Sequence, residues 1–592
     1  MDNTEDKLVE NSPKRLNMQA WINSLISLRI SEDAQEPAAL LLQQVFQAIE
    51  QGDSCIQCAE SQALQLQGLS IGAEQAAAQV IAPFIFDGQH LYLYRYWALE
   101  HQLAQAAAQL KRQNIQTAQL TEQHMALLTD AQQQRALQMV AANALSIITG
   151  GPGTGKTYTL ARIIAVMNQL NPGIRIAMAA PTGKAAQRMK EALQNSFNDA
   201  KLQDLVSENL TRLMPITIHR LLGLGEDQRP RFHAKRPLPF DVIVVDEASM
   251  LDLNLAQMLF AAVAPETRLI LLGDANQLAS VDVGAVLADL QQVPELASNR
   301  INLITSHRFD GEKLIGRMAA FIQQNASEQE VLARFEQEIA PAGALQAVTL
   351  TPDMQDVVQL QYLPEEGQGH QIQMDWAAYY DQLMLGFKAY AAALDEYLAS
   401  DSDAPPIGAV IHHFDDYRIL AAVRHGYLGL TALNKQMEAR ILKQTAQAKT
   451  GEWYTGRPVM MTYNDYQLGL SNGDIGICFG RRQAGKVQFS VYFPSLQKWV
   501  AAARLPKNIE TAYAMTIHKS QGSEFKHTAV VLDANALQLL SKELIYTAIT
   551  RAKKAVSLLA APSALAAAMT VKTARRSGLS SQIDQKLGIL CQ

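Results

Sequence analysis

The stretch that decides the fold is Gly150-Gly151-Pro152-Gly153-Thr154-Gly155-Lys156-Thr157. It follows the apolar run Leu145–Thr149 and precedes apolar residues at helical spacing from Leu160 to Met167, which predicts a strand, a glycine-rich loop and a helix. Glycines let backbone N–H groups turn toward phosphates, and the positive end of the helix adds to the attraction. Lys156 can then reach the β- and γ-phosphates, and the Thr157 hydroxyl can bind Mg²⁺. The stretch therefore predicts a site for ATP and Mg²⁺.

Two further apolar strands end in polar residues suited to hydrolysis. The run Phe240–Val245 leads directly into Asp246 and Glu247, and Arg268–Leu272 leads to Gln277. We expect Asp246 to hold Mg²⁺ and Glu247 to polarise the attacking water. Gln277 is placed to sense the γ-phosphate. Because helical patterns separate the strands, the chain predicts an α/β fold with a doubly wound parallel sheet.

Two more segments of this region predict ligand contacts. Gln133 falls on a predicted helix just before the first strand, where its side-chain amide can read both hydrogen-bonding edges of adenine. A buried strand, Ile174–Ala180, ends in Pro181–Ala186. Loops at the carboxyl ends of parallel strands bind ligands, and here the ligand need not be the nucleotide.

Bulk properties limit the class of protein. The 592 residues are too many for one hydrophobic core and predict about three or four domains. A net charge of −6 argues against a broadly basic surface but allows a local basic groove. The apolar runs are strand-sized, below the ~20 residues that span a bilayer. The polar first twenty residues lack the apolar core of a secretory signal, so we expect no membrane segment and a cytoplasmic location.

The motifs, taken in order, resemble those of superfamily-one helicases. They are Gly150–Thr157, Pro181–Ala186, Thr217–Gly223, Asp246–Met250, Gly273–Leu278, Ser306–Phe309, Thr516–Phe525 and Glu543–Ala552. The residues of the last two motifs, together with Gly456–Met460 and Asn464–Asp474, resemble those of the RecD family, the alpha subunits of RecBCD enzymes (exodeoxyribonuclease V). The resemblance covers roughly residues 80 to 560.

The resemblance implies a mechanism and a set of contacts. Two RecA-like P-loop lobes would close on ATP, and Arg308 and Arg551 would be arginine fingers that stabilise charge on the γ-phosphate. Single-stranded DNA would cross the top of both lobes and contact Thr182, Lys184, His219, Thr516, His518 and Lys519. His219 and His518 taken alone would fit buried, hydrogen-bonded histidines equally well.

These observations predict four parts. They are an N-terminal, mainly helical and partner-binding domain at 1–110, a first RecA-like lobe at 111–330, a second at 331–452 with 504–592, and a small β-barrel insertion at 453–503. Alternating apolar positions with turns at Asn472-Gly473 and Ala484-Gly485 predict the insertion, and the resemblance makes it SH3-like. Residues 331 to 405 read as helical or irregular, and Asp87-Gly88 predicts a hairpin.

The resemblance implies an ATP-dependent helicase motor that moves 5′ to 3′ on single-stranded DNA. Such a chain would join RecB and RecC subunits at duplex ends in recombinational double-strand break repair. We find no cluster of acidic residues suited to a metal nuclease outside the ATP motifs, so we expect no nuclease site in this chain. Two alternatives are a free-standing RecD-like helicase and a P-loop protein that uses nucleotide as a switch.

Overall fold

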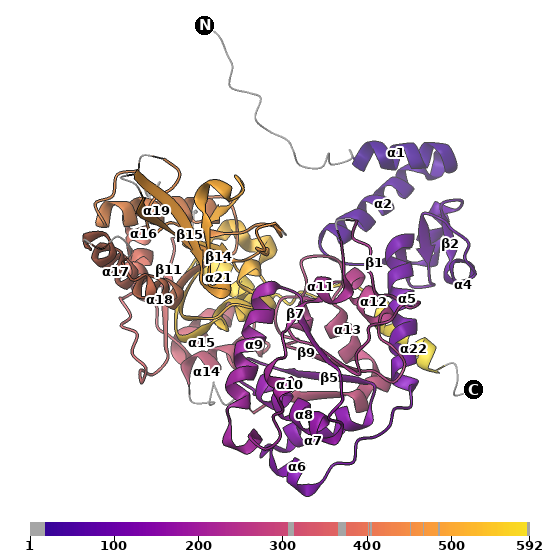
Figure 1. Ribbon diagram of the computed structural model, residues 1–592. Helices are drawn as coiled ribbons and strands as arrows, with labels where there is room; N and C mark the ends of the chain where they lie inside the picture. The colour runs from indigo at the N-terminus through magenta and orange to yellow at the C-terminus, as the bar shows by residue number, and fades with distance from the viewer. Residues whose placement is uncertain are drawn as a thin grey trace.

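The computed structural model describes residues 18–225, 227–305, 313–364, 375–400, 402, 405–449, 451–465, 467–483 and 486–588 (Figure 1). Two α/β lobes lie side by side, and an N-terminal block sits against the first of them. Arg308 and the turn at Ala484-Gly485 fall outside the described residues. Within those residues, no helix has the length and apolar character needed to cross a membrane.

The first lobe is built on a parallel sheet of six strands in the order β10-β5-β9-β8-β6-β7. The strands are β5 (Leu145–Gly150), β6 (Ile176–Ala180), β7 (Ile216–Thr217), β8 (Val242–Val245), β9 (Arg268–Gly273) and β10 (Arg300–Leu303). The helices are α6 (Glu122–Ala126), α7 (Ala131–Ala142), α8 (Lys156–Leu170), α9 (Gly183–Phe197), α10 (Glu208–Thr211), α11 (Ile218–Leu222), α12 (Leu253–Ala261) and α13 (Val286–Gln292). The predicted doubly wound parallel sheet is confirmed.

Both faces of this sheet are covered, which is why its strands read as continuous apolar runs. Successive side chains of a strand point to opposite faces. Ile147 accordingly packs in a core with Leu255 of α12, whereas Ile148 packs in a second core with Leu160 of α8. The two cores fix the carboxyl ends of the strands, where the polar motifs begin.

The second lobe holds a parallel sheet of five strands in the order β11-β20-β19-β12-β18. These are β11 (Val357–Tyr362), β12 (Tyr417–Ala421), β18 (Ala514–Thr516), β19 (Phe525–Leu532) and β20 (Ala552–Ala560). Its helices are α14 (Leu314–Gln323), α15 (Glu328–Glu338), α16 (Trp376–Met384), α17 (Lys388–Ala399), α18 (Gly408–Asp416), α19 (Leu430–Gln444), α20 (Lys542–Ile549) and α21 (Pro562–Thr570). The interpretation of 331 to 405 as helical or irregular was wrong for β11, an edge strand with polar Gln359 and Gln361 between apolar residues.

Between α19 and β18 the chain forms an antiparallel sheet in the order β16-β15-β14-β13-β17. Its strands are β13 (Pro458–Met460), β14 (Ile475–Gln483), β15 (Lys486–Phe493), β16 (Lys498–Ala501) and β17 (Glu510–Thr511). The turn at Asn472-Gly473 comes directly before β14, with Gly473 at a φ of +89°. The sheet reaches past residue 503 to β17, so the predicted insertion ends too early. The SH3-like barrel stays a prediction.

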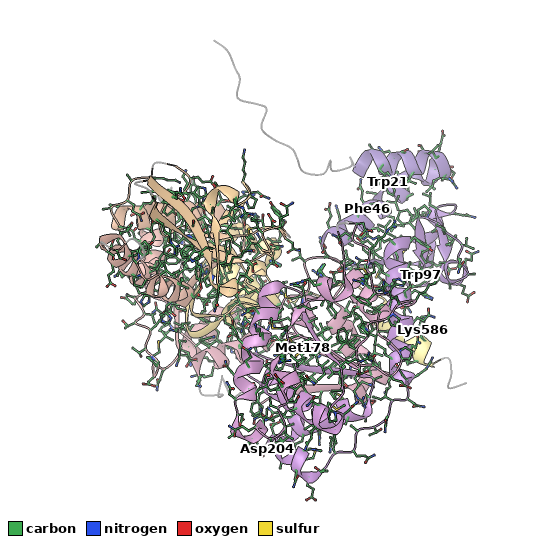
Figure 2. All side chains as sticks on the ribbon, viewed as in Figure 1. Trp21, Phe46, Trp97, Met178, Asp204 and Lys586 are labelled. Carbon is green, nitrogen blue, oxygen red and sulfur yellow. The ribbon has the colours of Figure 1, made fainter. Side chains whose placement is uncertain are left out.

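The N-terminal block combines helices with a four-stranded sheet in the order β1-β4-β3-β2. Its elements are α1 (Met18–Arg29), α2 (Gln35–Glu50), β1 (Cys55–Gln57), α3 (Glu60–Ala63), β2 (Ser70–Gly72), α4 (Ala73–Ala77), β3 (Phe84–Phe86) and β4 (His90–Leu93). The predicted hairpin at Asp87-Gly88 is confirmed, because β3 and β4 pair and Gly88 has a φ of +99°. Trp21 of α1 meets Phe46 of α2 edge to face, with ring centroids 5.4 Å apart (Figure 2).

The long helix α5 (Tyr94–Arg112) and the C-terminal helix α22 (Leu579–Gly588) both belong to the first lobe. They pack against each other and share its core through Leu103 and Leu579 (Figure 1). The assignment of residues 504–592 to the second lobe was therefore wrong for α22. A boundary at residue 110 also leaves much of α5 on the wrong side, since its buried face completes the core of the first lobe.

One buried carboxylate joins these distant segments. Glu100 of α5 is fully buried and accepts hydrogen bonds from Ser54 Oγ at 2.5 Å, Ser577 Oγ at 2.9 Å and Gln582 Nε2 at 3.0 Å. Burial raises the pKa of Glu100 to about 7, although the hydrogen bonds oppose the rise. The N-terminal block, α5 and the C-terminal segment thus share one polar contact.

Candidate functional site

The glycine-rich loop runs from the end of β5 to the start of α8, as predicted. Gly153 and Gly155 adopt left-handed conformations, with φ of +78° and +81°. A Cβ on Gly150 would lie 2.6 Å from Thr154 Oγ1. The Lys156 ammonium folds back over the loop and donates hydrogen bonds to the carbonyl oxygens of Gly150 and Gly151, at 2.6 and 3.1 Å. The lysine is therefore held where the phosphates of a nucleotide would lie.

A cavity of about 370 Å³ beside this loop gathers the predicted catalytic residues from both lobes. The first lobe lines it with Lys156, Thr157, Asp246, Glu247 and Gln277, and the second lobe with Arg551. Five of the six predicted catalytic residues thus meet in one cavity, and the sixth, Arg308, lies outside the described residues.

The two acids sit at the carboxyl end of β8 on a strained turn. Glu247 has a φ of +53°, a conformation that non-glycine residues adopt at a cost of about 1 to 3 kcal/mol. Its backbone N–H donates to Asp246 Oδ1 at 2.8 Å. Burial and the neighbouring Glu247 carboxylate raise the pKa of Asp246 to about 6, and the Lys156 ammonium opposes that rise. A bound cation would favour the charged form of Asp246.

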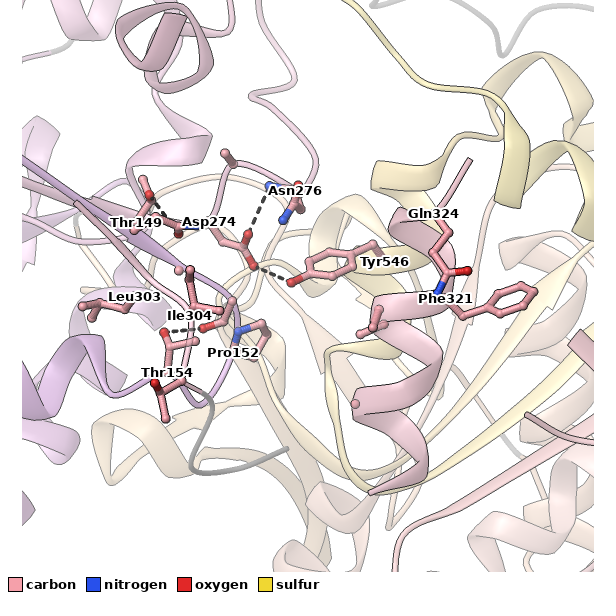
Figure 3. A pocket seen from close by; sticks show the side chains of 18 of the residues that line it. Thr149, Pro152, Thr154, Asp274, Asn276, Leu303, Ile304, Phe321, Gln324 and Tyr546 are labelled. Atoms are coloured by element: carbon pink, nitrogen blue, oxygen red, sulfur yellow. Dashed lines mark hydrogen bonds between the residues drawn. The ribbon is translucent and has the colours of Figure 1, made fainter. Parts of the chain in front are cut away.

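Arg551 crosses the cleft between the lobes. It is buried, and its Nη2 donates to Gln277 Oε1 at 2.7 Å. The Gln277 amide in turn donates to Asp274 Oδ2 at 3.1 Å. The Tyr546 hydroxyl, also from the second lobe, donates to the same Asp274 oxygen at 3.1 Å (Figure 3). Asp274 and Tyr546 lie within the quoted motifs, but no pattern in the sequence indicates that they meet.

A larger cavity of about 1140 Å³ also borders the glycine-rich loop (Figure 3). Pro152 and Thr154 of the loop, Leu303 of β10 and Phe321 of α14 line it. Gly150, Gly151, Pro152 and Thr154 of the loop border this cavity, whereas Lys156 and Thr157 border the smaller one.

Gln133 lies on α7 and is buried, but it lines neither cavity. Its neighbours tie the start of α7 to the end of β10. Gln132 Oε1 accepts from the Ile304 N–H at 2.8 Å, and Asp130 Oδ2 accepts from Thr305 Oγ1 at 2.9 Å. The adenine contact predicted for Gln133 therefore stays a prediction.

The residues predicted to contact DNA lie at the carboxyl ends of three strands. Thr182 and Lys184 follow β6, and His219 follows β7. Thr516 ends β18, and His518 and Lys519 follow it. Thr182 Oγ1 caps α9 by accepting from the Ala185 N–H at 3.2 Å, and Thr516 Oγ1 accepts from the Lys519 N–H at 3.3 Å. Strand order thus groups these residues on one edge of each sheet.

Both lysines of this set already have protein neighbours, and the Lys184 ammonium lies 5.6 Å from the centroid of the Phe525 ring. Lys519 is ion-paired with Glu510 of β17 at 3.0 Å. Burial, together with the Arg418 guanidinium, lowers the pKa of Lys184 to about 8. Burial also lowers the pKa values of His219 and His518, which favours neutral imidazoles at both positions. DNA phosphates would have to compete with Glu510 for Lys519.

The sequence did not single out two charged residues of the smaller cavity. Arg188 of α9 and Glu524 at the end of the Thr516–Phe525 motif both line it and form an ion pair at 2.5 Å between the lobes. A signal for Arg188 existed, since it lies four residues after Lys184 and so on the same face of a helix.

Comparisons with known proteins agree with this geometry. Residues 133–283 match the AAA domain family, and residues 511–559 match the UvrD-like helicase C-terminal domain family. The RecBCD enzyme subunit RecD of Mycolicibacterium smegmatis is 35% identical over 84% of this chain and 82% of its own length. The subunit of the same name from Haemophilus influenzae is 34% identical over 85% of this chain and 82% of its own length.

Two more distant similarities complete the comparison. The ATP-dependent RecD2 DNA helicase of Deinococcus radiodurans is 29% identical over 71% of this chain and 48% of its own length. Among solved structures, a Bacteroides Pif1 helicase in complex with ADP-AlF3 and ssDNA is 15% identical, with a TM-score of 0.37, over 73% of this chain and 92% of that one.

Proposed function

The chain belongs to the RecD family of RecBCD enzyme subunits and is an ATP-dependent DNA helicase motor, and we propose that it moves 5′ to 3′ along single-stranded DNA. One observation carries the motor mechanism. Lys156, Glu247 and Gln277 of the first lobe and Arg551 of the second line the same cavity. A nucleotide bound there would contact both lobes, so binding and hydrolysis would change how they close.

In this mechanism each residue has one task at the phosphates. Lys156 leaves the carbonyl oxygens of its loop and binds the β- and γ-phosphates. Glu247 orients the attacking water and accepts its proton. Arg551 exchanges Gln277 for the γ-phosphate and stabilises the charge that develops there. When Gln277 loses its contact with Arg551, its hydrogen bond to Asp274 changes, and so does the hydrogen bond from Tyr546 to Asp274.

The residues fit a Mg²⁺ ion as well. A hydroxyl from Thr157 and a carboxylate from Asp246 line the same cavity, and both are oxygen ligands of the kind that Mg²⁺ prefers. When bound, the ion would neutralise negative charge on the nucleotide's phosphates. The raised pKa of Asp246 supports this assignment. Burial and the neighbouring Glu247 carboxylate disfavour its charged form, and a bound cation would offset both effects.

Single-stranded DNA is proposed to follow the carboxyl ends of β6, β7 and β18. Thr182, Lys184 and His219 would hold it on the first lobe, and Thr516, His518 and Lys519 on the second. Hydroxyls and a few cations suffice to follow phosphates without reading sequence. The direction of movement rests on the family, because the same ATPase parts serve motors of either polarity.

As a RecD-type subunit, the chain is proposed to join RecB and RecC partners at duplex DNA ends for break repair in the cytoplasm. The proposed partner-binding part is the N-terminal block from α1 to β4, and not all of residues 1–110, because α5 packs into the first lobe. Large apolar side chains are exposed on it, and a partner that covered them would remove apolar surface from water. These are Trp21, Leu28, Leu40, Leu64, Val80 and Ile81. We also propose that residues 453–511 form an SH3-like barrel, since their five-stranded sheet is antiparallel throughout and closure into a barrel would remove its exposed edges.

The proposal assigns no nuclease chemistry to this chain. Among the described residues, no group of three or more histidines, cysteines or acids is placed to hold a metal ion. A metal nuclease needs several such ligands at one point. The nuclease of the complex would then reside in a partner subunit.

The alternative is a free-standing helicase like the Deinococcus RecD2 protein. This chain matches less than half of that protein, whereas it covers about four fifths of the RecBCD subunits. The higher identity to the RecBCD subunits, 35% against 29%, favours the subunit. A protein that uses nucleotide only as a switch has little need for a complete set of hydrolytic residues. Glu247, Gln277 and Arg551, which line one cavity, therefore favour a motor.

Strand separation on tailed duplexes tests the proposal. The full-length chain, alone and with candidate RecB and RecC subunits, is given ATP and a duplex with a 5′ or a 3′ single-stranded tail. We expect displacement from the 5′ tail only, with the labelled strand left intact. Displacement from the 3′ tail would contradict the direction, and ATP-independent degradation by the isolated chain would contradict the absence of a nuclease site.

A further inference from the structure

The first turn of α9 packs directly against residues 522–525 of the second lobe. Gly522 has a φ of +68°, and a Cβ there would lie 3.3 Å from the Ala185 Cβ and 3.5 Å from Thr182 Oγ1. The glycine therefore lets the backbone of one lobe approach the start of a helix in the other. Both sides of this contact belong to segments proposed to hold DNA.

Two cations on successive turns of α9 extend the contact to Glu524 and Phe525. The Lys184 ammonium lies 5.6 Å from the centroid of the Phe525 ring, and Arg188, one helical turn on, is ion-paired with Glu524 at 2.5 Å. The other Glu524 oxygen is 3.1 Å from the Lys553 ammonium. Because residues 524 and 525 are neighbours in the chain, a movement of the backbone at Glu524 would also shift the Phe525 ring that lies by Lys184.

The two contacts face different ligands. Lys184 is at the end of α9 that is proposed to hold DNA, whereas Arg188 lines the cavity that holds Lys156 and Arg551. All three cations of that cavity have protein acceptors in this structure. Lys156 donates to loop carbonyls, Arg551 donates to Gln277, and Arg188 pairs with Glu524. Arg188 is the one whose acceptor is itself charged.

We propose that Arg188 couples the nucleotide state to DNA binding through its ion pair with Glu524. The inference rests on the proposed ATPase site. Without triphosphate, Arg188 holds Glu524 and Phe525 against α9, as in this structure. The γ-phosphate of ATP competes for Arg188 and repels Glu524, since opposite charges attract and like charges repel strongly in a partly buried cavity. Loss of the ion pair then lets Glu524 and Phe525 move away from α9, which alters the contact between the Phe525 ring and Lys184.

Coupling between two sites requires two states of the residues that link them, and the proposal gives Arg188 two such states. In one, the pair joins the lobes, and in the other Arg188 faces the phosphate. A purely structural ion pair would behave differently, because its removal would weaken the fold without changing how nucleotide affects DNA affinity. The test therefore compares DNA affinities in two nucleotide states and not DNA affinity alone.

The experiment measures the dissociation constant of a fluorescent oligo-dT with the full-length chain, in ADP and in a non-hydrolysable ATP analogue. The variants are Arg188→Gln, Arg188→Lys and Glu524→Gln. Lys190→Gln is the matched control, since Lys190 lies on the same helix but does not line the cavity. Binding of a fluorescent ADP checks that each variant keeps a folded nucleotide site.

For the wild type and Lys190→Gln, we expect the two DNA dissociation constants to differ about fivefold or more. Arg188→Gln and Glu524→Gln should reduce the ratio to less than about twofold, whereas Arg188→Lys, which keeps the charge, should retain most of it. Glu524→Gln removes the pair but no phosphate-facing cation, so it tests the coupling even if Arg188→Gln binds nucleotide poorly. If Arg188→Gln and Glu524→Gln both keep the wild-type ratio of the two DNA dissociation constants, the inference about Arg188 is overturned and the proposed function is not. A wild type without any nucleotide effect on DNA affinity would overturn the proposed function with it.

Discussion

Arg551 of the second lobe donates a hydrogen bond to the side-chain oxygen of Gln277 in the first, with Nη2 and Oε1 2.7 Å apart. The two residues are 274 positions apart in the chain. Other hydrogen bonds join the same segments, from the Leu278 N–H to Thr547 Oγ1 at 2.9 Å and from Gln521 Nε2 to the Leu278 carbonyl at 2.8 Å. The residues proposed as γ-phosphate sensor and arginine finger thus contact each other across the two lobes.

Replacing the arginine tests its proposed role. Arg551→Ala should lower kcat for ATP by about 10³-fold or more, because arginine fingers stabilise charge that appears only during phosphoryl transfer. Nucleotide affinity should change far less. Steady-state hydrolysis with single-stranded DNA measures the first quantity, and fluorescent nucleotide binding the second. Arg504→Ala, an exposed arginine of the insertion, is the control. Hydrolysis within tenfold of wild type would contradict the assignment.

Glu247 should be needed for hydrolysis but not for binding. Glu247→Gln keeps the size of the side chain and its place at the end of β8, but it removes the base for the attacking water. We expect turnover to fall about 10²- to 10⁴-fold, with ATP still bound. Glu266→Gln, which changes an exposed acid before β9, should leave turnover unchanged. If Glu247→Gln hydrolyses ATP normally, another group activates the water.

Stability should depend on pH through the buried Glu100. Its pKa is about 7 in the folded chain and about 4.5 when exposed. Between these values the folded state keeps a proton that the unfolded state releases, so stability falls as pH rises from about 4.5 to 7 and then levels off. The full effect is on the order of 3 kcal/mol. Urea unfolding of the first lobe at pH 5 and pH 7 measures it.

Glu100→Gln should flatten that dependence, because glutamine keeps hydrogen-bonding groups without the titrating proton. Part of the slope should remain, since burial raises the pKa of the nearby Asp289 to about 8. Glu50→Gln, an exposed acid on α2, serves as the control. An equally steep decline in Glu100→Gln would mean that other groups cause it.

Lys519 should contribute one phosphate contact to DNA binding. For Lys519→Gln, the slope of log K against log salt concentration should become shallower by about 0.7, the value for one contact to a single strand. Titrations of oligo-dT at several salt concentrations measure the slope. Lys507→Gln, at an exposed position between β16 and β17, should leave it unchanged. An unaltered slope for Lys519→Gln would mean that its pair with Glu510 persists on DNA.

The parts of the site that the sequence predicted are those encoded by short local patterns. A glycine loop, or an acid after a buried strand, fixes its own geometry within a few residues. Strands of a parallel sheet then bring their carboxyl ends together, so Lys156, Asp246, Glu247 and Gln277 meet without further information. Arg551 was predicted through the resemblance, because nothing near it in the chain points to the distant phosphate loop.

The features that the sequence did not predict depend on contacts between distant segments. Strand β11 alternates polar and apolar residues at a sheet edge and lies within a largely helical region. Helix α22 returns to the first lobe because Leu579 fits the core beside α5, and such a return has no local signal. Glu100 and Gln582, and likewise Arg188 and Glu524, are paired only by the fold.

ATP hydrolysis with and without single-stranded DNA, compared between the wild type and Lys156→Gln, tests the central claim most directly. The account predicts turnover that DNA stimulates severalfold and that Lys156→Gln abolishes, because the lysine would no longer bind the phosphates between the lobes. Wild-type turnover that DNA does not change would contradict the motor and favour a nucleotide switch.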